Sequence, residues 1–438
     1  MSQKNRAAVL GLDGVPFSLL QKLFSAGVMP NLAAAAREGC FLRMETSHPC
    51  VSSVAWTSFM TGENPGVHGI FGFTDVAANR LALKLPSFDD IQCPVVWQRL
   101  PGKKSLVVNL PFTYPARPLN GILIAGFVAP IFERAVYPAS LIPWLRLRNY
   151  RADVDAVQGR RDRQAFIDDL FQTLDIHASV LLELMAERPW DLFIGVLTAT
   201  DRLHHFFFDA CEDQNHPLHE MVLSFYRKID RVVGEFLLKA GPRSRTLFLS
   251  DHGFTRLRTQ VYLNHILKTL GYLRYTTPQP KGLEDVHPAS RAFAMDPSRI
   301  YIPTRERFGG GAGGRQEAEA VRRSLQADLE SLRARDIGIL EPDAGLAPSE
   351  RVFAKVMVKE EVYRGPLLAM APDLVVIPAN GYDLKASLAA TAATQKDIFT
   401  GMHTHDDAFL IATEPEIGTR LPQPHITDVC RLMLEVLA

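Results

Sequence analysis

The sequence has little cysteine, no long apolar run and no excess of charge of one sign. Its five cysteines are scattered and odd in number, without C-x-x-C spacing, which argues against a disulfide framework and against a thiolate zinc site. Basic and acidic residues number 48 each, so no global electrostatic field points to a nucleic-acid duplex or an anionic membrane. The absence of an 18-residue apolar stretch argues against a membrane span.

The first apolar run lies close to the start of the sequence. Only six residues precede it, fewer than a signal peptide needs, so we expect no signal peptide. The cysteine usage favours a reducing compartment, so we expect a cytoplasmic protein. The sequence does not define an oligomeric state.

What the sequence does contain is an alternation of short apolar runs and helical stretches. With 47% apolar residues, the 438-residue chain can bury a large core. Strands are predicted over residues 7–12, 105–110, 121–127, 192–197, 246–249, 373–377 and 408–412. Helices are predicted over residues 17–26, 163–187, 218–239, 315–333 and 427–437. This alternation predicts an α/β fold, in which a mostly parallel sheet carries helices on both faces.

The alternation lapses between residues 265 and 372. We therefore expect residues 1–264 and 373–438 to form the α/β core, and residues 265–372 to form an inserted cap or substrate lobe whose role the sequence does not define. A glycine-rich run at 309–314 lies in this lobe. It lacks the G-x-x-x-x-G-K-[ST] order of a phosphate-binding loop, so a mobile surface loop near the cleft is the better interpretation.

Two predicted strands end in residues that can bind a metal ion. The strand at 246–249 is followed by Ser250, then by Asp251 and His252, and the strand at 7–12 is followed by Asp13. A buried strand usually ends in turn-forming residues, whereas carboxylates and imidazoles at the carboxyl ends of parallel strands can gather at one edge of the sheet.

Two further segments add ligand candidates. Asp201 and His205 follow the strand at 192–197, and a helix starting near Asp201 would place both on one face because they are four residues apart. His403 precedes the strand at 408–412, with His405 close by as a rival.

Each of these residues alone has a simpler interpretation. An aspartate after a strand is most often a helix cap or a turn former, and a histidine beside an apolar run is more often structural. Their order beside predicted strands favours a joint role. Three carboxylates and three imidazoles without a thiolate suit two Zn²⁺ ions, with Mn²⁺ or Fe²⁺ as alternatives.

A residue with a hydroxyl group lies where another helix is predicted to begin. Ser52 and Ser53 lie at this point, and either could simply be a helix N-cap. The start of a helix also stabilises phosphate oxygens, and a metal ion can activate a hydroxyl. Ser52 is therefore a candidate nucleophile, with Ser53 as its rival.

Taken together, these motifs resemble the alkaline phosphatase superfamily, and within it the type I phosphodiesterase and nucleotide pyrophosphatase branch. The resemblance rests on motifs along nearly the whole chain, namely Gly11-Leu12-Asp13-Gly14, the Ser52 segment with Thr61-Gly62, Thr200-Asp201 with His205, Ser250-Asp251-His252-Gly253 and Gly401-Met402-His403. It implies an alkaline-phosphatase-like three-layer sandwich with a metal-binding catalytic core.

The resemblance also implies roles for the candidate residues. Asp201, His205 and His403 would hold one zinc ion, and the second would be held by Asp13, Asp251 and His252. Ser52 falls on the family's Ser/Thr nucleophile and would contact the second ion. Arg202 and His204 flank the ligand pair and are candidates to contact phosphate.

Two departures bear on the substrate. The sequence after Cys50 lacks the C/S-x-P-x-R setting of a sulfatase. The family's asparagine that holds a phosphoryl oxygen has no clear match, since Asn109 could equally be a turn residue.

We expect a metal-dependent phosphoester hydrolase that cleaves a phosphodiester or nucleotide pyrophosphate through a phosphoserine-type intermediate. Its substrate would be a small phosphoester, with a nucleotide as one option. A phosphomonoesterase or phosphomutase on the same core, and a non-catalytic metal-binding scaffold, stay open as alternatives.

Overall fold

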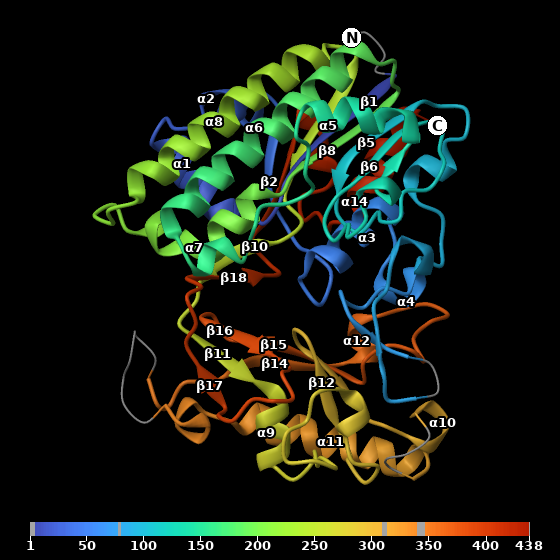
Figure 1. Cartoon of the computed structure of the whole chain (residues 1–438), viewed down its shortest axis with the longest axis vertical. Coiled ribbons are helices and arrows are strands. Elements are labelled where there is room, and N and C mark those ends of the chain that lie inside the picture. The colour runs from blue at the N-terminus through green and yellow to red at the C-terminus, as the bar shows by residue number, and fades with distance from the viewer. Residues whose placement is uncertain (1–4, 78–79, 309–312, 340–346, 438) are drawn as a thin grey trace. The chain divides into compact units, whose positions relative to one another are not determined.

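The computed structural model of the chain describes residues 5–77, 80–308, 313–339 and 347–437 (Figure 1). Two compact units are formed, one by Met1–Asn64, Ser87–Thr255 and His403–Ala438, the other by Pro65–Pro86 and Arg256–Met402. Among the described residues, no helix has both the length and the apolar character needed to span a bilayer. Most of the predicted glycine-rich loop, residues 309–312, lies outside the described residues.

An eight-stranded sheet forms the centre of the first unit, in the order β2-β19-β9-β1-β8-β5-β6-β7. Its strands are β1 (Arg6–Leu12), β2 (Cys40–Met44), β5 (Ser105–Leu110), β6 (Gly121–Ala125), β7 (Val136–Tyr137), β8 (Leu192–Leu197), β9 (Ser244–Leu249) and β19 (Ala408–Ala412). Strands β9, β1, β8, β5 and β6 are parallel, whereas β19 and β7 run antiparallel to their neighbours. The prediction of a mostly parallel sheet is confirmed.

The helices of the first unit are α1 (Phe17–Ser25), α2 (Pro30–Glu38), α3 (Ser52–Thr61), α5 (Ile142–Leu147), α6 (Arg163–Glu187), α7 (Ala199–Glu212), α8 (His219–Ala240), α13 (Pro415–Arg420) and α14 (Asp428–Leu437). The bounds of α6 are those predicted. Its start is fixed by Asp162, whose side chain accepts hydrogen bonds from the backbone N–H groups of Gln164 and Ala165.

Two glycines of the sheet show that helices cover both of its faces. A Cβ atom at Gly11 of β1 would collide with Trp56 of α3, and one at Gly195 of β8 would collide with Leu181 of α6. Gly11 pairs with Val196, the residue after Gly195, and successive strand residues point to opposite faces. Helices α3 and α6 therefore lie on opposite faces, which Figure 1 also shows.

The sheet order explains why distant segments meet at one edge. Strands β9, β1 and β8 are direct neighbours and run parallel, so the residues that follow Leu249, Leu12 and Leu197 emerge side by side. Strand β19 runs antiparallel to β9, which brings its amino end to the same edge. A separate two-stranded sheet is formed by β10 (Gly253–Arg256) and β18 (Gly401–Thr404).

The second unit has its own sheets and its own apolar core. Its strands form the orders β12-β13-β15-β14, β16-β11-β17 and β3-β4. They are β3 (Asp75–Val76), β4 (Leu83–Lys84), β11 (Thr259–Tyr262), β12 (Phe293–Met295), β13 (Arg299–Tyr301), β14 (Phe353–Val358), β15 (Leu374–Pro378), β16 (Tyr382–Lys385) and β17 (Thr394–Gln395). Its helices are α4 (Pro65–His68), α9 (Leu263–Thr269), α10 (Arg305–Phe308), α11 (Arg315–Ser331) and α12 (Lys359–Val362).

This unit differs from the expected lobe at residues 265–372. It begins at Arg256, ends at Met402 and includes the upstream segment Pro65–Pro86. The strand predicted at 373–377 for the core is β15, which instead pairs with β13 and β14 in this unit. A short buried apolar strand has the same sequence pattern in either sheet, so the pattern alone could not assign it.

A buried arginine explains why the upstream segment belongs here. The Arg299 side chain is fully buried, and a Cβ atom at Gly72 would lie 2.7 Å from its guanidinium carbon. The hydroxyl of Tyr301 donates to Asp75 over 3.0 Å, and Asp75 also lies 3.9 Å from an Arg299 nitrogen. A buried guanidinium needs polar partners, and Thr74 and Asp75 of the upstream segment add to those that the carbonyl oxygen of Asp296 provides.

Candidate metal centre

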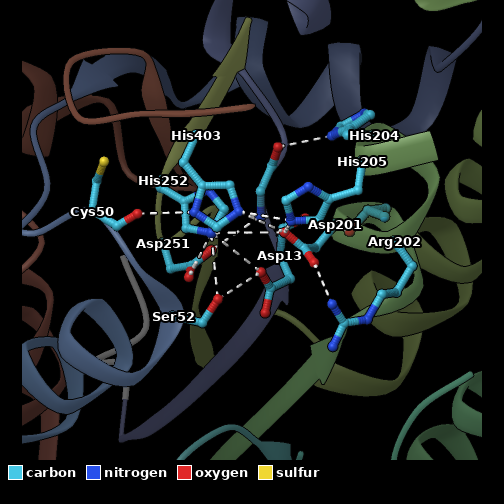
Figure 2. A network of polar contacts seen from close by, with 12 residues as sticks. Asp13, Cys50, Ser52, Asp201, Arg202, His204, His205, Asp251, His252 and His403 are labelled. Carbon is cyan, nitrogen blue, oxygen red and sulfur yellow. Dashed lines mark hydrogen bonds and ion pairs between the residues drawn. The ribbon is translucent and has the colours of Figure 1, made fainter. Parts of the chain in front are cut away.

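The structure brings the six predicted ligand residues together in two groups at one edge of the sheet (Figure 2). The Asp201 group consists of Asp201, His205 and His403, and the Asp13 group consists of Asp13, Asp251 and His252. Within each group, the three candidate donor atoms lie within 4.8 Å of one another. This spacing is compatible with a shared cation.

In the Asp201 group, three donor atoms face one another at short range. Nε2 of His205 and Nε2 of His403 are 3.0 Å apart, and they lie 3.4 Å and 3.2 Å from Oδ1 of Asp201. That oxygen is buried and has no hydrogen-bond partner among the described residues. Helix α7 carries Asp201 and His205 on one face, as their four-residue spacing predicts.

In the Asp13 group, His252 lies between two carboxylates. Its Nε2 is 3.3 Å from Oδ2 of Asp251 and 3.7 Å from Oδ1 of Asp13, and all three side chains are fully buried. Within the part of the chain that the structure describes, Oδ2 of Asp251 likewise has no hydrogen-bond partner. A buried carboxylate oxygen without a partner is costly unless a cation or another donor reaches it.

Backbone carbonyls fix the tautomers of two histidines. Nδ1 of His403 lies 2.9 Å from the carbonyl oxygen of Cys50, and Nδ1 of His252 lies 3.1 Å from that of Gly253. Because a carbonyl oxygen only accepts, each Nδ1 carries the hydrogen and donates it. When such a ring is neutral, its lone pair is then on Nε2, which faces its group, as in metal-binding histidines.

Each of the three carboxylates has one oxygen held by the protein and the other turned toward the imidazoles. The indole N–H of Trp56 donates to Oδ2 of Asp13 over 3.1 Å. The backbone N–H of Gly14 donates to Oδ1 of Asp251 over 3.0 Å, and Arg202 donates to Oδ2 of Asp201 over 3.4 Å. Sequence reasoning did not predict any of these three holding contacts.

Charge is poorly balanced within the Asp13 group. Burial raises the pKa of Asp13 well above its usual range, and repulsion from Asp251 and Asp201 raises it further. Burial also raises the pKa of Asp251 to about 6. Burial lowers the pKa of His252 well below its usual range, which keeps its ring neutral. Added positive charge would relieve this imbalance, so the donor set fits a divalent cation.

The Asp201 group is better compensated by the protein. Burial favours the protonated form of Asp201, but His205, His403 and Arg202 together hold the pKa of this carboxyl well below its usual range. An anionic carboxylate beside two imidazole nitrogens is also a donor set that fits a divalent cation.

Ser52 lies against the Asp13 group. Its Oγ is 3.4 Å from Oδ1 of Asp13 and 3.4 Å from Nε2 of His252, and the side chain is nearly buried. The N-cap of α3 is Val51, so neither Ser52 nor Ser53 caps this helix. The hydroxyl of Ser53 is buried, and no described residue forms a hydrogen bond with it.

The remaining candidates have other partners. Asn109 donates from Nδ2 to the carbonyl oxygen of Val196 over 3.0 Å and accepts from the Tyr150 hydroxyl over 3.2 Å. Its side-chain amide therefore forms hydrogen bonds within the protein interior. The ring of His405 packs against that of His48, and His405 belongs to neither group. His403 is therefore the better placed of the two rival histidines.

A family model described as type I phosphodiesterase / nucleotide pyrophosphatase matches residues 7–406. The chain therefore belongs to the type I phosphodiesterase / nucleotide pyrophosphatase family, and it is a phosphoester hydrolase of that class. No curated protein sequence gave a significant match.

Solved structures show the same fold. The structure of phosphonoacetate hydrolase from Sinorhizobium meliloti 1021 aligns with a TM-score of 0.65 and 16% identity, covering 99% of this chain and 96% of that one. Human ectonucleotide pyrophosphatase / phosphodiesterase 5 aligns with a TM-score of 0.55 and 13% identity, covering 99% of this chain and 94% of that one. An inactive form of the murine protein in complex with AMP aligns with the same score and identity, covering 100% and 95%. These similarities confirm the alkaline-phosphatase-like α/β fold.

Proposed function

We propose that the chain hydrolyses a phosphodiester or a nucleotide pyrophosphate, with Ser52 as the nucleophile. The observation that carries this proposal is the contact of the Ser52 hydroxyl with both Asp13 and His252, each at 3.4 Å. A hydroxyl that touches two members of a candidate ligand group is well placed for activation.

The proposed ligands of two divalent ions are the Asp201 group and the Asp13 group. Such ions, bound there, would offset the negative charge of the attacking and leaving oxygens during an in-line displacement. Nitrogen and oxygen donors without thiolate suit Zn²⁺, with Mn²⁺ and Fe²⁺ as alternatives.

The chain's own residues would bind and attack the phosphoryl group. Ser52 Oγ forms a bond to phosphorus while the bond from phosphorus to the leaving oxygen breaks, and water then hydrolyses the phosphoserine ester. Ser52 is the first residue of α3, and the start of a helix favours phosphate oxygens through its backbone N–H groups and its dipole.

Hydrolysis or transfer of a phosphomonoester is the second candidate, and Arg202 favours it. Its Nη1 lies 3.4 Å from Asp201, and a guanidinium beside the centre suits the extra negative charge of a monoester. However, Arg202 also pairs with Asp153 over 2.6 Å, which offsets part of its charge. This pairing favours the diester as the first candidate.

A phosphoester panel with added Zn²⁺ or Mn²⁺ tests the function. It comprises a diester, a monoester and a dinucleotide with the same aromatic leaving group, together with phosphonoacetate, because phosphonoacetate hydrolase shares the fold. Faster cleavage of the diester or dinucleotide than of the monoester supports the first candidate. Two bound ions without hydrolysis of any substrate would favour the non-catalytic scaffold.

Substitution of the nucleophile gives a sharper test. Ser52→Ala should reduce kcat by at least about 10³-fold while metal content stays unchanged, because the hydroxyl is lost but every proposed ligand remains. Ser53→Ala is the matched control, since Ser53 is the buried neighbour in the same helix. Retained activity in Ser52→Ala would overturn the assignment of the nucleophile.

The proposed setting is the cytoplasm. The five cysteines all lie within the described residues and form no disulfide, which is compatible with a reducing compartment. The proposed partner is a small phosphoester, and the AMP complex of the murine relative makes a nucleotide a reasonable first choice.

A further inference from the structure

Helix α7 carries two pairs of polar residues, and the members of each pair are four residues apart. Asp201 and His205 face the other candidate ligands, and Thr200 and His204 are the residues immediately before them. Residues four apart share a face of a helix, so the second pair forms its own row beside the first. Thr200 and His204 are both fully buried.

The second row holds the turn that follows β1. The hydroxyl of Thr200 lies 2.6 Å from the carbonyl oxygen of Asp13, closer than its 3.1 Å contact to that of Leu197. Nδ1 of His204 lies 2.9 Å from the carbonyl oxygen of Gly14 (Figure 2). Two side chains from successive turns of α7 thus bind two successive carbonyl groups of one turn.

The tautomer of His204 follows from its partners. A carbonyl oxygen only accepts, so Nδ1 must carry the hydrogen that it donates to Gly14. Nε2 then accepts from the hydroxyl of Tyr226 on α8, 2.6 Å away. Both ring nitrogens are used, and His204 does not face the candidate ligands. Its role differs from the phosphate contact expected from the sequence.

The turn held in this way belongs to the other ligand group. Asp13 is itself a member, and the backbone N–H of Gly14 donates to Oδ1 of Asp251. Gly14 has a φ of 67°, and a Cβ atom there would lie 2.7 Å from the Phe254 ring and 3.1 Å from the His252 ring. The turn therefore packs directly against its group and has little room to shift.

We propose that Thr200 and His204 form a positioning pair that sets the separation of the two ligand groups. Helix α7 carries Asp201 and His205, two members of one group, and through Thr200 and His204 it also binds the turn that carries Asp13, a member of the other group. The inference rests on the proposed two-ion centre and adds the residues that fix its spacing. A displacement in line requires that spacing to be held closely.

A zinc titration of the metal-free chain, in competition with a chelator, tests the proposal. The informative comparison is His204→Asn against His204→Leu, each combined with Tyr226→Phe so that no tyrosine hydroxyl is left without an acceptor. Asn and Leu have nearly the same shape, but only Asn can donate to the Gly14 carbonyl. Thr200→Val removes the hydrogen bond to the Asp13 carbonyl oxygen and provides a second test if the His204 variants do not fold.

The expected result is that the wild-type chain and the Asn variant bind two zinc ions with similar constants. In the Leu variant and in Thr200→Val, the more weakly bound ion should lose about 10- to 100-fold in affinity, as for other residues that orient metal ligands. With Mn²⁺, the magnetic coupling between the two ions, seen by electron paramagnetic resonance, should weaken in the same variants.

His219→Leu is the matched control. Nδ1 of His219 lies 2.7 Å from the carbonyl oxygen of Ala210 at the far end of α7, and this contact does not involve either group. Zinc binding should be unchanged in this variant.

Wild-type constants for both ions in His204→Leu/Tyr226→Phe and in Thr200→Val would overturn the proposal, as would a wild-type chain that does not bind two ions. The titration needs no turnover. It therefore decides the positioning role even if the phosphoester panel shows no hydrolysis and the proposed function fails.

Discussion

The two ligand groups lie at the same edge of the sheet but differ in how they are balanced. The Asp13 group is fully buried and holds two carboxylates against one neutral imidazole. In the Asp201 group, the side chains of His205 and His403 are 23% and 19% exposed, and one carboxylate faces two imidazoles and a guanidinium. The protein thus leaves the charge of the Asp13 group largely uncompensated, whereas it partly balances the charge of the Asp201 group.

The largest expected effect is on catalysis. Asp251→Asn should lower kcat/KM by at least about 10³-fold, because it removes a proposed ligand from the group that Ser52 contacts. His205→Asn should cause a smaller loss, since it alters the group that Ser52 does not touch. Zinc content and kcat/KM of both variants check this. A larger loss of kcat/KM in His205→Asn than in Asp251→Asn would contradict the expected difference between the two ligand groups.

A second test uses the stability of the metal-free chain. Asp251→Asn should raise the free energy of unfolding by about 1–3 kcal/mol, because it removes a buried carboxyl whose charge is not compensated. Asp201→Asn should lower it, because Asp201 has favourable neighbours. Denaturant unfolding in the presence of a chelator measures both. All four tryptophans (Trp56, Trp97, Trp144 and Trp190) lie in the first unit, so their fluorescence reports on this unit alone.

The same contrast predicts a pH dependence for the metal-free chain. The folded-state pKa of Asp251 is raised to about 6, so the folded chain holds this proton more tightly than the unfolded chain does. The stability from this group is present below about pH 4 and is lost as the pH rises through about 6. Asp251→Asn should flatten the profile over this range. An identical profile in the variant would contradict the assignment.

The smallest expected effect concerns Trp56. Trp56→Phe removes the indole N–H that holds Oδ2 of Asp13, and zinc affinity of the Asp13 group should fall about 10-fold. The ring of Phe59, which packs edge-on against Trp56, offers the control Phe59→Leu. A similar loss of zinc affinity in Trp56→Phe and Phe59→Leu would show that the effect comes from packing and not from the hydrogen bond.

Sequence patterns were sufficient to predict the main elements of the first unit and to select the candidate ligands. Asp13 and Asp251 each follow a buried strand closely, and neighbouring parallel strands bring such residues to one edge. His403 was selected with them, although the pattern did not reveal that β19 is antiparallel. Their roles as ligands, and that of Ser52 as nucleophile, stay predictions.

The contacts that hold the candidate ligands could not be predicted. His204 was expected to contact phosphate, because a sequence does not show which carbonyl group a side chain will bind. The extent of the second unit was missed for a similar reason. Its upstream segment joins through the buried Arg299, a contact between residues more than 200 positions apart.

The course of the chain has a consequence for synthesis. The chain leaves the first unit after Thr255 and returns to it at His403, so the last member of the Asp201 group is synthesised only after the whole of the second unit. The Asp13 group, in contrast, is complete once His252 has been translated. During synthesis from the amino terminus, the Asp13 group is therefore complete early, whereas Asp201 and His205 lack their third member until His403, which follows His205 by 198 residues.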